Sequence, residues 1–137
     1  MKLEAQICSL ELAKIIYELG VKRDSLFYWC KNKYEKEFCV IGNGRICVDG
    51  CSFCFALYKE AEDEVYSAYT VAELGEMLPD NIFSCPSIDR KDHIHDRMYY
   101  CKDVFNKIEP INANTEANAR AKMLIYLIEN KLLEVKK

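Results

Sequence analysis

Residues Val65–Pro79, with the sequence VYSAYTVAELGEMLP, hold the strongest local signal for the fold. The first five residues are rich in β-branched and aromatic side chains and predict a strand. Thr70 and Glu73 then have the spacing of a capping box, in which each side chain binds the backbone N–H group of the other residue. Tyr69 and Leu74 have the spacing of a hydrophobic staple across the same helix start. We therefore expect a strand that runs directly into a short helix, which the closing proline ends.

Two longer amphipathic helices are predicted near the ends of the chain. The first begins after Ser9, a favourable N-cap, and ends at Gly20, which suits the left-handed position after a helix. The second begins after Asn114 or Thr115, and Glu116 lies favourably near the positive end of its dipole. Apolar residues recur at helical spacing in both: Leu12, Ile15, Ile16 and Leu19 in the first, and Ala117, Ala121, Leu124, Ile125, Ile128 and Leu132 in the second.

Further strands are predicted around this framework. Asn43-Gly44 and Asp49-Gly50 supply the turns of an antiparallel meander. A second hairpin is predicted from Ile82 to Cys101, with its turn at residues 89–92, and Pro86 confines its first strand to an edge or to irregular structure. The strands before that hairpin are predicted at Leu26–Cys30, Phe38–Ile41, Arg45–Val48, Ser52–Tyr58 and Val65–Tyr69.

Together these elements predict one α+β domain spanning residues 1–137. We expect an antiparallel sheet of about five strands, with the N-terminal and C-terminal helices packed on it and a short central helix. The oligomeric state does not follow from these patterns.

The composition is that of a globular protein, with 50% hydrophobic and 30% charged residues. A net charge of −3 provides no general basic field, so we expect no nucleic-acid partner. No apolar stretch has the length of a membrane span, and residues Met1–Ser9 lack the pattern of an export signal, which predicts a cytoplasmic protein without a membrane partner. Its eight cysteines are then expected to be reduced and to pack as small hydrophobic residues.

Three cysteines could nevertheless bind metal. Cys47, Cys51 and Cys54 resemble in spacing the iron–sulfur motif of radical SAM enzymes, but no alternating β-α pattern follows them. A structural zinc site is the other alternative, with a fourth ligand from Cys39, His93 or His95. A two-residue turn at Asp49-Gly50 would instead place Cys51 on the opposite face of the hairpin from the other two thiols. We therefore expect neither metal nor cofactor, with a small zinc-binding module as the alternative.

Two sets of residues are candidates for ligand binding. His93, His95, Arg97 and Tyr99 alternate and so share one face of a strand, where the arginine and imidazole groups could donate hydrogen bonds to an anion. The other interpretation of this row is a polar face that protects an edge strand. Tyr28 and Trp29 could line a ligand pocket or a partner surface, although aromatic runs more often form core pairs.

Several segments resemble a family of small uncharacterised proteins from phages and mobile elements of gut bacteria: Ser9–Lys14, Glu18–Lys22, Ser25–Trp29, Ser67–Pro79 and Glu116–Leu127. The resemblance implies a common origin and one fold, but no activity, since the family has none assigned. The sequence also lacks a phosphate-binding glycine loop, a dinucleotide fingerprint and a nucleophile elbow. The resemblance therefore implies a non-catalytic accessory protein that binds a host protein or sequesters a small anionic molecule.

Overall fold

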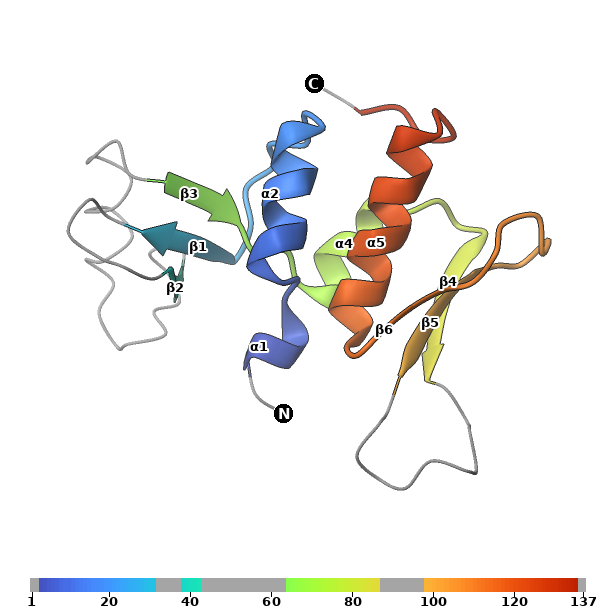
Figure 1. Cartoon of the computed structure of the whole chain (residues 1–137), viewed down its shortest axis with the longest axis horizontal. Coiled ribbons are helices and arrows are strands. Elements are labelled where there is room, and N and C mark those ends of the chain that lie inside the picture. The colour runs from blue at the N-terminus through green and yellow to red at the C-terminus, as the bar shows by residue number, and fades with distance from the viewer. Residues whose placement is uncertain (1–2, 32–37, 43–63, 87–97, 136–137) are drawn as a thin grey trace.

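The computed structural model describes residues 3–31, 38–42, 64–86 and 98–135 of the chain. This part of the chain contains helices and antiparallel strands, so the predicted α+β class is confirmed (Figure 1). The helices are α1 (Leu3–Gln6), α2 (Leu10–Glu18), α4 (Val71–Met77) and α5 (Glu116–Glu129). The strands are β1 (Phe27–Lys31), β2 (Cys39–Gly42), β3 (Glu64–Ser67), β4 (Ile82–Pro86), β5 (Tyr99–Asp103) and β6 (Ile111–Ala113).

The described strands form two three-stranded sheets, with the orders β2-β1-β3 and β4-β5-β6. Figure 1 shows the helices between these sheets, with the first sheet beyond α2 and the second beside α5. The prediction of a single sheet is therefore not confirmed in the described residues, because the helix layer separates the two groups of strands. The strands predicted at residues 45–48 and 52–58, and the turn predicted at residues 89–92, lie outside the described residues.

The helices begin where the local signals predict. Ser9 caps α2 and Thr115 caps α5, each by accepting a hydrogen bond from a backbone N–H group in the first turn, at 3.4 and 3.2 Å. The capping box of α4 is complete, with 3.2 Å from Glu73 N to Thr70 Oγ1 and 3.0 Å from Thr70 N to Glu73 Oε1. Gly20 follows α2 with a φ of 98°, the left-handed conformation that glycine adopts without strain.

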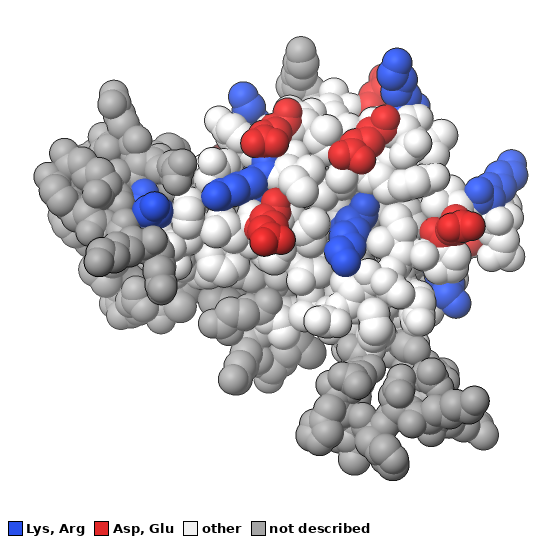
Figure 2. All heavy atoms as spheres, viewed as in Figure 1, with Lys and Arg blue, Asp and Glu red and all other residues white. Residues whose placement is uncertain are grey.

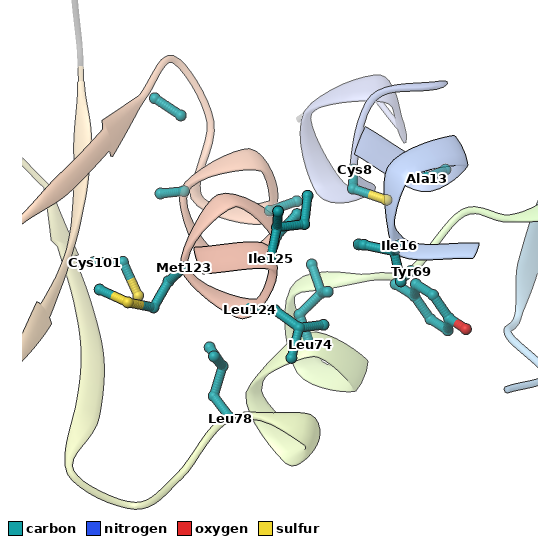
Figure 3. Packing of buried hydrophobic residues seen from close by; sticks show 14 of the residues in the cluster. Cys8, Ala13, Ile16, Tyr69, Leu74, Leu78, Cys101, Met123, Leu124 and Ile125 are labelled. Atoms are coloured by element: carbon teal, nitrogen blue, oxygen red, sulfur yellow. The ribbon is translucent and has the colours of Figure 1, made fainter. Parts of the chain in front are cut away.

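Helix α5 forms the centre of the core (Figure 3). It packs against α2, against α4 and against the sheet β4-β5-β6, so its side chains are buried on several faces. Ala117 and Ala121 are fully buried, and their small size lets the neighbouring elements approach closely. Tyr69 and Leu74, at the spacing of a hydrophobic staple, lie in the same buried cluster. The strand and helix of Val65–Pro79 are thus joined to the core at their junction.

Some features differ from the expectation. Ile15 and Leu132, predicted on apolar helix faces, are 37% and 57% exposed. Leu132 lies beyond the end of α5, because Lys131 has a φ of 58° and turns the chain out of the helix. The three-residue strand β6 was not predicted. Pro86 does end an edge strand, as expected, because β4 pairs only with β5 among the described strands.

Candidate functional site

The predicted aromatic site residues on β1 are tied into the fold. Tyr28 is buried, and its hydroxyl donates a hydrogen bond to Asp24 Oδ1 at 3.1 Å and accepts one from Ser25 N at 3.2 Å. Burial raises the pKa of the Tyr28 phenol to about 12. Trp29 is half-buried, and its indole N–H donates to the Cys8 carbonyl at 3.0 Å. These contacts stabilise β1, and a role of either side chain in ligand binding stays a prediction.

Of the predicted anion site on the second hairpin, only Tyr99 lies within the described residues. Tyr99 is half-buried, packs against the central cluster and pairs with Ala113 of β6. His93, His95 and Arg97 lie outside the described residues, so their shared strand face stays a prediction. The same holds for the three cysteines of the proposed metal cluster, Cys47, Cys51 and Cys54.

A cleft of about 310 Å³ lies at the C-terminal ends of α4 and α5, and we call it the C-terminal cleft. Its surface is mostly apolar, with side chains from α4, α5 and the segment that follows α5: Met77, Leu78, Leu124, Ile128, Leu133 and Val135. Charged residues also line it: Arg23, Glu76 and Glu134. An apolar surface with a few charged groups is typical of sites that bind small molecules.

The end of α5 builds one wall of this cleft. After the left-handed residue Lys131, the N–H groups of Leu132 and Leu133 both donate to the Leu127 carbonyl, at 2.8 and 3.2 Å. These bonds turn the last described residues back toward α2, where a Cβ atom added at Gly20 would lie 3.7 Å from Val135 Cγ1. The wall therefore has a defined conformation that depends on the helix end.

Arg23 lines this cleft and has a fixed backbone. Its N–H donates to the Tyr69 hydroxyl at 3.0 Å, and its carbonyl accepts from the Tyr69 hydroxyl at 3.0 Å and from Ser67 Oγ at 2.6 Å. Arg23 is exposed, and no carboxylate of the described residues lies within ion-pair distance of its guanidinium. A planar donor fork of this kind can bind a carboxylate through two parallel hydrogen bonds.

A second hollow of about 290 Å³ is more polar and lies at the start of α2 and α5. Four of its polar residues bind one another in pairs: Asn118 Oδ1 accepts from Ser9 N at 2.8 Å, and Lys122 Nζ donates to the Asn112 carbonyl at 3.3 Å. Figure 2 shows acidic and basic side chains interspersed over the helices on the face in view, without a patch of one sign. The C-terminal cleft is therefore the better candidate for a ligand.

Two buried thiols are poor candidates for nucleophiles. Burial raises the pKa of Cys8 to about 12 and that of Cys101 to about 11. Both are therefore protonated near neutral pH, whereas the thiolate is the reactive form. Within residues 3–31, 38–42, 64–86 and 98–135, no three or more His, Cys, Asp or Glu side chains gather into a possible metal site.

Comparison of the chain with family models, with curated proteins and with solved structures finds no match. Among the described helices, none combines the length and the apolar character that crossing a membrane would require.

Proposed function

We propose that this protein is a non-catalytic binding protein that holds a small ligand with an apolar body and a single carboxylate in the C-terminal cleft. The observation that carries this proposal is the position of Arg23, an arginine with a fixed backbone and no carboxylate partner among the described residues, on a mostly apolar cleft. The proposal keeps the small anionic ligand that the sequence predicts, but it places the binding site at other residues.

The size and chemistry of the cleft support the apolar part of the ligand. Its volume of about 310 Å³ lies at the lower end of the range for small-molecule sites. Burial of apolar ligand surface contributes about 25 cal/mol per Å² before the entropic cost of binding is subtracted. An unbranched or cyclic hydrocarbon body would contact Leu124, Ile128 and Leu133 without leaving a buried polar group unpaired.

The charges that line the cleft limit the charge of the ligand. Arg23 favours a carboxylate, but Glu76 and Glu134 line the same cleft and would repel further negative charge. A monoanion can pair with the arginine, whereas a nucleotide would bring several negative charges toward these carboxylates. The proposed class is therefore an apolar monocarboxylate rather than a phosphorylated molecule.

The test compares octanoate with 1-octanol, which has the same apolar body and no charge. Binding of each is followed by amide and methyl chemical shifts of the whole chain, in wild type, Arg23→Gln and Lys22→Gln. Lys22 is a matched control, because it is an exposed cation next in sequence that does not line the cleft. We expect octanoate to shift Leu124, Ile128 and Leu133, and Arg23→Gln to weaken it about tenfold, the effect of losing a charged hydrogen bond.

The control variant and the control ligand test the role of Arg23 separately from the role of the apolar cleft. Lys22→Gln should leave octanoate binding unchanged, and Arg23→Gln should leave 1-octanol binding unchanged. Equal weakening by both variants, or shifts that omit the cleft, would remove the cleft as the site. Recovery of a chemically altered carboxylate after denaturation would remove the non-catalytic part of the proposal.

A protein partner is the second candidate, and the turn after β5 favours it. Val104 and Phe105 are 56% and 67% exposed on this turn, and the Phe105 N–H donates to Asp103 Oδ1 at 3.0 Å. Aromatic residues, phenylalanine included, are enriched in protein interfaces. A photo-crosslinking residue at position 105 should then give one defined adduct in cells, and the same residue at Tyr126 should not. Equal labelling at both positions would argue against a specific surface.

A further inference from the structure

Two cysteines lie directly opposite each other on neighbouring strands of the first sheet. Cys30 of β1 and Cys39 of β2 are partners in the antiparallel register, in the pair that follows Trp29 and Val40. Directly opposed residues of antiparallel strands have Cα atoms about 4.5 to 5.5 Å apart, with side chains on the same face. A disulfide needs Cα atoms about 4.4 to 6.8 Å apart. The register therefore meets the backbone requirement for a bond between these two sulfurs.

The surroundings of the pair also suit this bond. Cys30 is fully buried, while Cys39 is half-buried and packs against the cluster that Cys30 forms with Tyr28. Neither cysteine forms a disulfide in this structure. Among the described strands, β2 pairs with β1 alone. Cys39 is thus the accessible sulfur of the pair and Cys30 the protected one.

We propose that Cys30 and Cys39 form a redox modification site that a small disulfide, such as glutathione disulfide, converts into a cross-strand disulfide. The Cys39 thiolate attacks one sulfur of the small disulfide, which forms a mixed disulfide and releases one thiolate. The Cys30 thiolate then attacks the Cys39 sulfur and displaces the second small thiolate. The two protein thiols lose two protons and two electrons, and the small disulfide is reduced to two thiols.

The second sheet contains a pair of cysteines that serves as an internal control. Cys85 of β4 and Cys101 of β5 lie on neighbouring strands, but they are not partners: Cys85 pairs with Tyr100, and Cys101 pairs with Ser84. Because successive residues of a strand point to opposite faces, these two thiols lie on different faces of their sheet. The same oxidant should therefore leave Cys85 and Cys101 unlinked.

Oxidation at this site would join β1 to β2 covalently. A cross-link that closes a loop restricts the unfolded chain, so the oxidised protein should unfold at a higher temperature than the reduced protein. This inference does not depend on the ligand of the C-terminal cleft, because neither cysteine lines it.

The experiment incubates the folded full-length protein with an excess of glutathione disulfide, blocks free thiols with N-ethylmaleimide and identifies linked peptides by mass spectrometry. We expect a Cys30–Cys39 link as the main product, with Cys85 and Cys101 alkylated. The Cys39→Ser variant should lose the link and the gain in unfolding temperature. The Cys85→Ser variant, altered at another half-buried strand cysteine, should keep both.

The proposal is overturned if Cys30 and Cys39 remain alkylated after equilibration with the oxidant. It is also overturned if Cys39 links mainly to Cys47, Cys51 or Cys54, or if Cys85 and Cys101 become linked as readily. If Cys39→Ser does not fold, the proposal is still tested, because the Cys30–Cys39 peptide link is measured separately in wild type and in Cys85→Ser.

Discussion

The Tyr69 hydroxyl binds both backbone polar groups of Arg23, accepting a hydrogen bond from its N–H and donating one to its carbonyl, each at 3.0 Å. The ring of Tyr69 is buried in the core, so this contact joins the core to a residue of the C-terminal cleft. Burial also raises the pKa of this phenol above its ordinary value of 10.0. The position of Arg23 thus depends on a side chain far from it in sequence.

We expect Tyr69→Phe to keep the core packing and to lower the free energy of unfolding by about 1 to 2 kcal/mol, because it leaves the Arg23 backbone groups without this partner. Urea unfolding followed by circular dichroism measures the change. Octanoate affinity should fall as well, because the Arg23 backbone is less well fixed. The matched control is Tyr126→Phe, at an exposed residue, which should change neither quantity. Equal effects of the two substitutions would contradict this assignment.

The helix starts could be predicted from the sequence because their signals are local. Ser9, Thr70 and Thr115 each bind a backbone N–H group three residues later, so the whole interaction lies within a few residues. The arrangement of the sheets could not be predicted in the same way. Whether β1 and β5 share a sheet depends on where α5 packs, and that is decided by contacts between distant segments.

The C-terminal cleft had no recognisable signal for a similar reason. Arg23 and Leu133 stand at opposite ends of the sequence, and neither belongs to a motif. The aromatic residues Tyr28 and Trp29 did stand out, but their partners are Asp24 and the Cys8 carbonyl, groups that aromatic patterning does not identify. Residue type alone could not distinguish a binding surface from a stabilised strand.

Gly75 lies beside the guanidinium of Arg120, and we expect Gly75→Ala to destabilise the protein. Alanine normally favours a helix over glycine by about 1 kcal/mol. Here its Cβ would overlap Nη1 of Arg120, which donates to the Val71 carbonyl at 2.9 Å. The Arg120 side chain also donates to Ser84 Oγ at 3.0 Å and to Glu116 Oε1 at 3.2 Å, so displacing it weakens the contacts of α5 with α4 and β4.

A double-mutant cycle tests this explanation by urea unfolding. In the Arg120→Ala background the space is free, so Gly75→Ala should become neutral or stabilising, with a coupling of about 1 kcal/mol or more. If Gly75→Ala has the same effect in both backgrounds, its cost does not come from Arg120.

Asp103 should make the protein sensitive to acid. Hydrogen bonds from Asn81 Nδ2 at 2.9 Å, Phe105 N at 3.0 Å and Lys107 N at 3.2 Å hold its pKa below the ordinary value of 3.8, the bond from Asn81 contributing most. Because the folded carboxyl binds a proton less readily than the unfolded one, its contribution is present above about pH 4 and is lost as pH falls through the folded pKa.

Urea unfolding between about pH 6 and about pH 3 measures this loss. We expect Asp103→Asn to be less stable than wild type at the higher pH and to show a smaller further loss in acid. The control variant Asp80→Asn, at an exposed residue, should lose as much free energy of unfolding in acid as wild type does. An unchanged acid slope in Asp103→Asn would mean that other carboxyl groups dominate the effect.

Cys8 should resist alkylation in the folded protein far more than Cys85. Its side chain is fully buried, and burial raises its pKa to about 12, so few molecules carry the thiolate at neutral pH. Its N–H donates to the Tyr69 carbonyl at 2.9 Å, which fixes the segment between α1 and α2 against the core. Alkylation then requires this segment to open, and its rate reports the free energy of that opening.

With iodoacetamide at neutral pH and peptide mass spectrometry, we expect Cys8 to react at least about 100-fold more slowly than the half-buried Cys85. The two should react alike in urea, and similar native rates would show that the start of the chain opens easily.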